Sequence, residues 1–137
     1  IRPLARRKET TRHSYHLYVF RYDSRMFDGI PRKLFVDAMN AEGIPVSEGY
    51  NVPIYRQPFM LAKRFGPFDG WKRTNPELDY RDTSCPVTER AAAEEGCWMS
   101  QNVLLGTRKD MQDIVSAVLK IYEGKNQLHS LKRKYCR

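Results

Sequence analysis

The sequence predicts a small α+β domain, in which a few strands are covered by helices. Strand-like and helix-like patterns follow one another along the 137 residues in the order strand, helix, strand, long loop, helix, strand and helix. Charged residues make up 29% of the chain and hydrophobic residues 41%, as in an ordinary soluble globular domain. A chain of this length can bury one hydrophobic core without disulfides or a metal ion.

The first two elements are a strand and a helix. Residues 14–23, SYHLYVFRYD, are dense in Tyr, Val and Phe and contain no breaker, which is typical of a strand buried on both faces. Pro31 then suits the first turn of a helix, and Gly43 suits the position just after the end of that helix. The helix has one apolar stripe, formed by Leu34, Phe35, Ala38 and Met39.

The middle of the chain is richer in turn residues. Residues 44–50, IPVSEGY, predict a short second strand, and residues 51–58, NVPIYRQP, an ordered loop, because proline is unsuited to a central strand. Residues 59–65 are expected to form a short helix. The stretch 66–84 is rich in Gly, Pro, Asp and Asn and predicts a long surface loop, of a kind that is often functional or mobile.

Residues 84–106 combine a helix start with a buried strand. Pro86 fixes the first helical turn, and Glu89 near the helix N-terminus interacts favourably with the helix dipole. Residues 91–95 are strong helix formers, and Gly96 is expected to end this helix. The next segment, CWMSQNVLL, predicts a strand or an extended insertion into the core.

The last expected element is a long amphipathic helix. Thr107 is its expected N-cap, with Asp110 three residues later, and the helix should run to about Gly124. Its apolar face is formed by Met111, Ile114, Val115, Val118 and Tyr122.

The net charge of +8 is concentrated at the two ends of the chain. Residues 1–13 carry +4 and residues 120–137 carry +5, whereas the middle carries −1. A surface that binds nucleic acid would be expected to show a basic stripe with interleaved aromatic residues on its folded face. The distribution therefore predicts solvated ends and no specific nucleic-acid partner, although a basic tail could still contact an acidic partner.

The sequence also bears on location and on cysteine chemistry. No apolar run approaches the roughly 18 residues of a membrane span, and the basic, Pro-containing start is unlike a signal peptide, so we expect a cytoplasmic chain with no membrane contact. The start at Ile1 instead of Met suggests a part of a longer protein. Cys85, Cys97 and Cys136 lack CxxC spacing, which predicts neither a disulfide framework nor a zinc site.

No catalytic motif stands out from the residues themselves. There is no Gly-rich phosphate loop, HExxH motif or nucleophile elbow. Lys63 and Lys120 lack the apolar, Gly/Ser-flanked setting of a Schiff-base lysine. Glu89 is interpreted as a helix-start charge instead of a general base, and His16 as a hydrogen-bonded histidine in the core or at a strand edge instead of a catalytic one.

Five blocks of the sequence follow one another in a recognisable order: HSYHLYVFRYD, RKLFVDAMNAEGIPV, YNVPIYRQP, CPVTERAAAEEGCWMSQNVLLG and DMQDIVSAVLKIYE. Together they resemble the C-terminal small domain of the DegT/DnrJ/StrS aminotransferases, pyridoxal-phosphate enzymes that aminate keto-sugars and keto-cyclitols. The motif VPIYRQP is most similar to the branch that acts on aminocyclitols and related ring ketones. The resemblance implies the small domain of a fold-type I aminotransferase, with a short, mainly antiparallel sheet covered by helices.

The same resemblance implies how the chain is organised and what accompanies it. Residues 1–13 would be a basic linker from a missing large domain, residues 14–128 the small domain, and residues 129–137 a basic tail. In the family, the large domain carries the Schiff-base lysine and most of the phosphate contacts. We therefore expect pyridoxal phosphate in a homodimeric parent enzyme, with a keto-sugar or keto-cyclitol and an amino-acid donor, and an inactive chain without cofactor when it is isolated.

Within this resemblance, the substrate-facing residues are expected on the extended segment between Pro53 and Pro58 and just before it. The candidates for substrate binding are Tyr50, Asn51, Tyr55 and Arg56, together with His16 in the first strand. Many family members that use nucleotide-sugars have His-Tyr-Pro where residues 49–51 stand here, and a second His at the position of Tyr55, so the departure argues against a nucleotide-sugar substrate.

Two alternatives stay open at this point. Tyr50 and Tyr55 could simply cap the edge of the core. The whole chain could also be a non-enzymatic binding module that contacts RNA or another protein through its basic ends.

Overall fold

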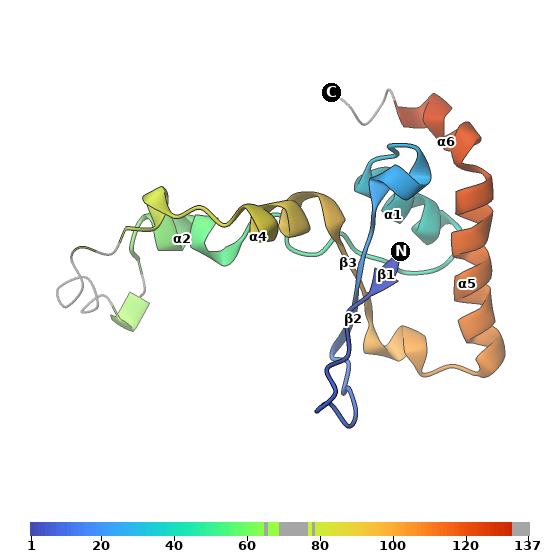
Figure 1. Ribbon diagram of the computed structural model, residues 1–137, viewed down its shortest axis with the longest axis horizontal. Helices are drawn as coiled ribbons and strands as arrows, with labels where there is room; N and C mark the ends of the chain where they lie inside the picture. Colours follow the sequence, from blue (N-terminus) through green and yellow to red (C-terminus); the bar gives the residue numbers. More distant parts are fainter. Residues whose placement is uncertain (65, 69–76, 78, 133–137) are drawn as a thin grey trace. The chain divides into compact units, whose positions relative to one another are not determined.

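The computed structural model describes residues 1–64, 66–68, 77 and 79–132. The chain divides into two compact units, the first formed by Ile1–Gly49 with Glu94–Arg137 and the second by Tyr50–Ala93. The predicted α+β class is confirmed, because helices accompany a three-stranded antiparallel sheet (Figure 1). The strands and α-helices are β1 (Arg2–Pro3), β2 (Leu17–Arg21), α1 (Arg32–Ala41), α2 (Pro58–Leu61), α4 (Pro86–Arg90), β3 (Gly96–Ser100), α5 (Arg108–Glu123) and α6 (Lys125–Lys132).

The sheet belongs to the first unit and has the strand order β1-β2-β3. β2 and β3 pair antiparallel from Leu17 opposite Ser100 to Arg21 opposite Gly96, which confirms the expected strand in CWMSQNVLL. This strand is shorter than the segment, because residues 101–104 form a 3₁₀ turn. β1 adds a short edge to β2, so part of the basic N-terminal segment takes part in the sheet.

The first strand is shorter and less buried than predicted. It begins only at Leu17, because Tyr15 has a φ of +47° and interrupts the extended run before it. At its other end Asp23 caps a 3₁₀ turn at Ser24–Phe27, which bends the chain away from the sheet. Within β2 only Phe20 is fully buried, so the strand is not covered on both faces.

The core lies where the helices cover the sheet, and its centre is aromatic. The ring of Tyr22 stacks on Phe35 with a centroid distance of 4.7 Å, and Phe27 contacts both rings. The Tyr22 hydroxyl donates a hydrogen bond to the Ile30 carbonyl at 2.8 Å, which satisfies the one polar atom of this buried side chain. Burial raises the pKa of Tyr22, and that of the Cys97 thiol to about 12, so both groups stay neutral.

The predicted second strand at residues 44–50 is wrong. Only a single antiparallel bridge forms there, in which Ser47 and Trp98 exchange backbone hydrogen bonds of 2.9 and 3.0 Å. Pro45 has no N–H to donate before the bridge, and Gly49 turns the chain after it with a φ of +74°. A Cβ atom at Gly49 would lie 2.7 Å from the Trp98 ring, so the backbone packs directly against the indole.

The long amphipathic helix is confirmed as α5. Thr107 caps it, and Asp110 completes a capping box by accepting a 2.6 Å hydrogen bond from the Thr107 N–H. α5 ends at Glu123, close to the expected Gly124, and α6 follows at once. No helix in the described ranges is both long and apolar enough to cross a membrane.

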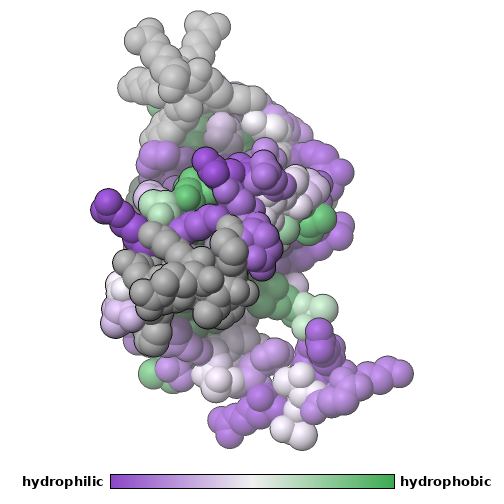
Figure 2. All heavy atoms as spheres, turned by 90° about the vertical axis from the view of Figure 1, so that its left-hand side faces the viewer, coloured by the Kyte–Doolittle hydropathy of each residue, from purple (hydrophilic) through white to green (hydrophobic). Residues whose placement is uncertain are grey.

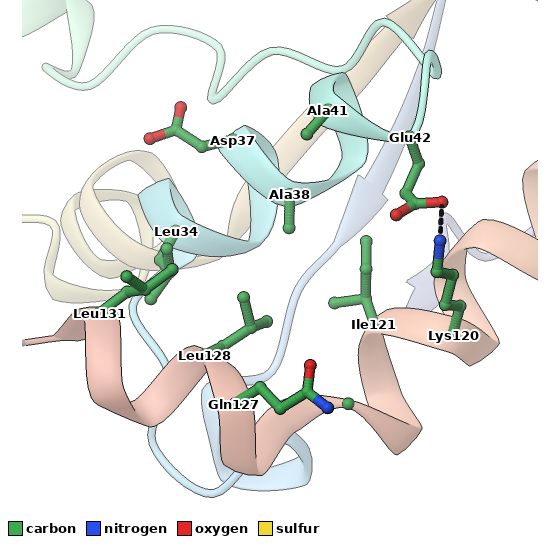
Figure 3. A pocket seen from close by; sticks show the side chains of 11 residues that line it. Leu34, Asp37, Ala38, Ala41, Glu42, Lys120, Ile121, Gln127, Leu128 and Leu131 are labelled. Carbon is green, nitrogen blue, oxygen red and sulfur yellow. Dashed lines mark hydrogen bonds and ion pairs between the residues drawn. The ribbon is translucent and has the colours of Figure 1, made fainter.

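α1, α5 and α6 enclose a groove of about 470 Å³ in the first unit (Figure 3). Leu34 and Ala38 of α1 face Ile121 of α5 and Leu128 of α6, so its floor is aliphatic. An ion pair of 2.7 Å between Glu42 and Lys120 borders one side. The groove offers aliphatic surface more than reactive groups.

The second unit is built from short turns around two small helices. α2 covers only Pro58–Leu61 of the helix predicted at residues 59–65, because Lys63 adopts a φ of +52° and ends it. α4 begins at Pro86 as predicted. Residues 69–76 and 78 of the long loop expected at residues 66–84 lie outside the described residues, and its described parts include 3₁₀ turns at Gly66–Phe68 and Tyr80–Asp82.

The junction after α4 differs from its prediction. Ala91–Glu95 widens into one π-helical turn, and Gly96 does not end a helix in a left-handed conformation but opens β3. Glu95 nevertheless anchors this point, because its carboxylate accepts a 2.8 Å hydrogen bond from Arg21 of the neighbouring strand and its carbonyl accepts one from the Tyr22 N–H. The chain thus passes from helix to strand without a loop.

Candidate functional site

A polar cluster in the second unit joins two of the predicted site residues to a third, unexpected one. Tyr55 and Arg56 lie on the 3₁₀ turn Ile54–Arg56, which is framed by Pro53 as its N-cap and Pro58 at the start of α2. Because each proline fixes its own φ, the turn is held with little conformational freedom to lose. Glu89, on the first turn of α4, points its carboxylate at both side chains.

Three donors converge on one oxygen of that carboxylate. Glu89 Oε1 accepts a short hydrogen bond from the Tyr55 hydroxyl, a 3.1 Å bond from Arg56 Nη2 and a 3.5 Å contact from the Cys85 N–H. The Cys85 N–H also donates to the Tyr55 hydroxyl oxygen at 3.1 Å. The Arg56 guanidinium lies over the Tyr55 ring, 5.4 Å from its centroid. The cluster therefore fastens the loop before α2 to the start of α4.

The contacts set the protonation states of the cluster. Hydrogen bonds from Tyr55 and then Arg56 hold the pKa of Glu89 below its ordinary value, so the carboxylate is ionised at neutral pH. Desolvation, followed by the hydrogen bond to Glu89, raises the pKa of Tyr55, so the phenol stays protonated and remains a donor. Arg56 is fully protonated, with its pKa raised by its contacts to Tyr55 and Glu89.

Tyr50 and Asn51 open the same unit. The Tyr50 side chain is 77% exposed, and none of the described residues of this unit is fully buried. The alternative that Tyr50 caps the edge of a core is therefore wrong. Tyr55 is half-buried, but its neighbours are the polar groups of the cluster and not a hydrophobic core.

His16 belongs to the first unit. It is exposed and directly precedes β2, so of the two expected positions, in the core or at a strand edge, the core position is wrong. With His13 and Tyr15, whose rings lie 5.0 Å apart, it borders a shallow hollow of about 230 Å³. The structure thus brings Tyr55 and Arg56 together with Glu89 and leaves His16 on a separate part of the fold.

The sequence interpretation did not place Glu89 in the site. It was assigned only to the helix dipole, because no local pattern connects it to Tyr55, 34 positions earlier. The available signal was the spacing Cys-Pro-x-x-Glu, which places the Glu carboxylate back over the N–H groups of the first turn. That position also makes the carboxylate reachable for a neighbouring loop.

Lys109, Lys120 and Lys125 do not have the setting of a lysine that anchors pyridoxal phosphate. A Schiff-base lysine needs a neutral, desolvated amine. Lys120 instead pairs with Glu42 on the surface, and contacts with Asp113 and Asp28 raise the pKa values of Lys109 and Lys125. The described ranges also contain no group of three or more His, Cys, Asp or Glu side chains that could hold a metal ion.

The coloured residues on the face drawn in Figure 2 are mainly hydrophilic, with hydrophobic residues in small separate groups. Exposed apolar side chains nevertheless accompany the cluster on the second unit. Val52 is 43% exposed, Ile54 72% and Phe59 48%. The described part of this unit therefore combines a fixed polar cluster with uncovered apolar side chains.

Comparison with known proteins relates the chain to aminotransferases. A Streptomyces kanamyceticus protein, provisionally named an L-glutamine:3-amino-2,3-dideoxy-scyllo-inosose aminotransferase, is 30% identical over 129 residues, which cover 87% of this chain and 29% of that protein. A protein of the same provisional name from Micromonospora echinospora is 27% identical over 90% of this chain and 30% of its own length. The L-glutamine:2-deoxy-scyllo-inosose aminotransferase of Streptoalloteichus tenebrarius is 27% identical over 95% of this chain and 30% of its length.

The chain therefore spans slightly less than a third of the length of these relatives. No family model matches it. The similarity nevertheless extends through both units of the fold, because it covers nearly the whole chain. The predicted relationship to aminotransferases is confirmed at this level.

Proposed function

We propose that this chain is part of an aminotransferase that transfers the amino group of L-glutamine to a keto-cyclitol. The observation that carries the proposal is that relatives named for this reaction match between 81% and 95% of the chain. Within the enzyme the chain would be the C-terminal small domain of a DegT/DnrJ/StrS aminotransferase, in a cytoplasmic homodimer. Pyridoxal phosphate, which supplies the chemistry of amino transfer, would be bound by the large domain.

In this proposal the second unit supplies one wall of the substrate site. A keto-cyclitol carries several hydroxyl groups on a small ring, so it is recognised mainly by hydrogen bonds. The phenol of Tyr55 and the guanidinium of Arg56 offer such bonds, and their turn is already ordered by two prolines and the contacts to Glu89. Tyr50 and Asn51 extend this polar surface at the start of the unit. Preordered groups bind a ligand with less loss of side-chain entropy.

The two half-reactions of the enzyme test this role. Tyr55→Phe removes one hydroxyl and keeps the ring. We expect about a tenfold loss in kcat/KM for 2-deoxy-scyllo-inosose, because one polar contact to the substrate is lost, and a change of less than about twofold in the single-turnover reaction with L-glutamine. Equal losses in both half-reactions, or no loss in either, would remove this loop from the substrate site.

The role of the cofactor has its own test. Mixed with pyridoxal phosphate and then dialysed, the isolated chain should retain no visible absorbance band of a bound Schiff base, because Lys109, Lys120 and Lys125 are ion-paired. A stable band after dialysis would show that a lysine of this chain binds the cofactor.

A further inference from the structure

The contacts of the Tyr55 hydroxyl fix which of its hydrogen bonds it donates and which it accepts. A phenol carries one hydrogen and two acceptor lone pairs. In this structure the hydrogen is given to Glu89, and one lone pair accepts the Cys85 N–H at 3.1 Å. Toward any further group Tyr55 can therefore only accept a hydrogen bond.

Arg56, in contrast, can only donate hydrogen bonds. Its guanidinium carries five N–H groups in one plane and no acceptor. The hydrogen bond to Glu89 uses Nη2, and among the described residues the structure gives no other carboxylate partner to this side chain. The exposed fraction of the Arg56 side chain is 41%, so its remaining N–H groups can donate to a ligand.

Together these neighbouring side chains present an acceptor beside a set of donors. A vicinal diol has the complementary pattern, because one hydroxyl can donate to the phenol oxygen while the oxygen of the next hydroxyl accepts from the guanidinium. The acceptor role of Tyr55 and the placement of the Arg56 donors both depend on the same Glu89 oxygen. Without a carboxylate there, the phenol hydrogen is released and the guanidinium loses the contact that holds it over the Tyr55 ring.

We propose that Glu89 is a positioning residue that fixes Tyr55 as an acceptor and holds the Arg56 donors beside it for two adjacent hydroxyl groups of the cyclitol ring. The proposal rests on the proposed function, since it names which part of the substrate this surface binds. Glu89 acts through Tyr55 and Arg56 and touches no reacting atom.

Glu89→Gln is the main test in the aminotransferase that contains this chain. The variant keeps the shape of the side chain. Its amide N–H can donate a hydrogen bond to Tyr55, which would reverse the direction of the hydrogen bond between the two side chains. We expect the KM for 2-deoxy-scyllo-inosose to rise about tenfold, and the half-reaction with L-glutamine to change less than about twofold. Glu89→Asp keeps the charge on a shorter side chain and should give an intermediate KM.

A double-mutant cycle separates positioning from general damage. If Glu89 acts largely through the Tyr55 hydroxyl, Glu89→Gln in the Tyr55→Phe background should raise the KM by only about twofold to threefold, the part due to Arg56. Cyclohexanone, which lacks the adjacent hydroxyls, should be used equally poorly by the parent and by Glu89→Gln. Asp113→Asn, which breaks the exposed ion pair with Lys109 on α5, is the matched control and should leave every constant unchanged.

The contact itself can be measured without activity. In the chain labelled with ¹³Cζ-tyrosine, the Tyr55 resonance, assigned with Tyr55→Phe, should titrate at higher pH in the parent than in Glu89→Gln. Equal titration in both, or equal effects of Glu89→Gln on the two half-reactions, would overturn the positioning role. An enzyme that shows the Tyr55 titration difference but does not aminate the cyclitol would instead overturn the proposed function.

Discussion

The first unit is held together by a hydrophobic core, whereas the second is held together by polar contacts. Among the residues that the structure describes, the thirteen buried apolar ones all lie in Ile1–Gly49 or Glu94–Arg137. In the described part of Tyr50–Ala93 no residue is fully buried, and the loop around Tyr55 is joined to α4 through Glu89. Burial of apolar surface is the main source of folding free energy. The first unit therefore provides stability, and the second is free to present polar groups in a set geometry.

Truncation in the core should show the largest difference between the units. Phe35 is fully buried between the Tyr22 and Phe27 rings, so Phe35→Ala should cost about 3–5 kcal/mol of unfolding free energy. Val87 in the second unit is 68% exposed, and Val87→Ala should stay within about 0.5 kcal/mol. Urea unfolding followed by circular dichroism measures both. Similar losses would show that the second unit also relies on apolar packing.

The close approach of backbone and indole at Gly49 gives the next largest effect. Gly49→Ala places a Cβ at 2.7 Å from the Trp98 ring and fixes an alanine at a φ of +74°, so we expect a loss of about 2–3 kcal/mol. Gly43 has a φ of +82° but open space around it, so Gly43→Ala should cost only about 1 kcal/mol. Equal losses from both substitutions would mean that the contact with Trp98 contributes nothing.

The capping box of α5 should contribute a smaller amount to the first unit. Thr107→Ala removes the side chain that accepts the Asp110 N–H, and should cost about 1 kcal/mol. Ser116, exposed in the middle of α5, is the control, since Ser116→Ala removes a hydroxyl without a cap. Thermal unfolding measures both variants. If Thr107→Ala unfolds at the same temperature as the parent, the end of α5 is fixed by packing alone.

Acid should loosen the Glu89 cluster of the second unit. The folded pKa of Glu89 is lowered, so its contacts are fully present above the ordinary carboxyl value of 4.5 and are lost as the pH falls through the lowered pKa. Hydrogen exchange of the Cys85 amide, which donates to the cluster, should quicken in that window relative to a core amide such as Tyr22. In the Glu89→Gln variant, exchange of the Cys85 amide should no longer quicken in this pH window. If both amides lose protection together, the units do not open separately.

The sequence predicted local structure better than long-range pairing. α1 and α5 were found because their apolar residues recur at helical spacing and because Gly43, Thr107 and Asp110 mark their ends. The expected strand at residues 44–50 failed, since only contact with Trp98 decides how much of it pairs. In the site, Tyr55 and Arg56 were named through the resemblance, but Glu89 was not paired with them. A hydrogen bond across 34 positions leaves no periodic pattern in the sequence.

Two backbone hydrogen bonds join Ser47, close to where the chain leaves the first unit, to Trp98, close to where the chain returns to it. Closing a loop costs entropy that grows only with the logarithm of its length, so a longer or shorter segment between these points changes the cost little. We therefore expect a change in the length of the segment between Tyr50 and Ala93 to alter the folding free energy of the first unit only slightly.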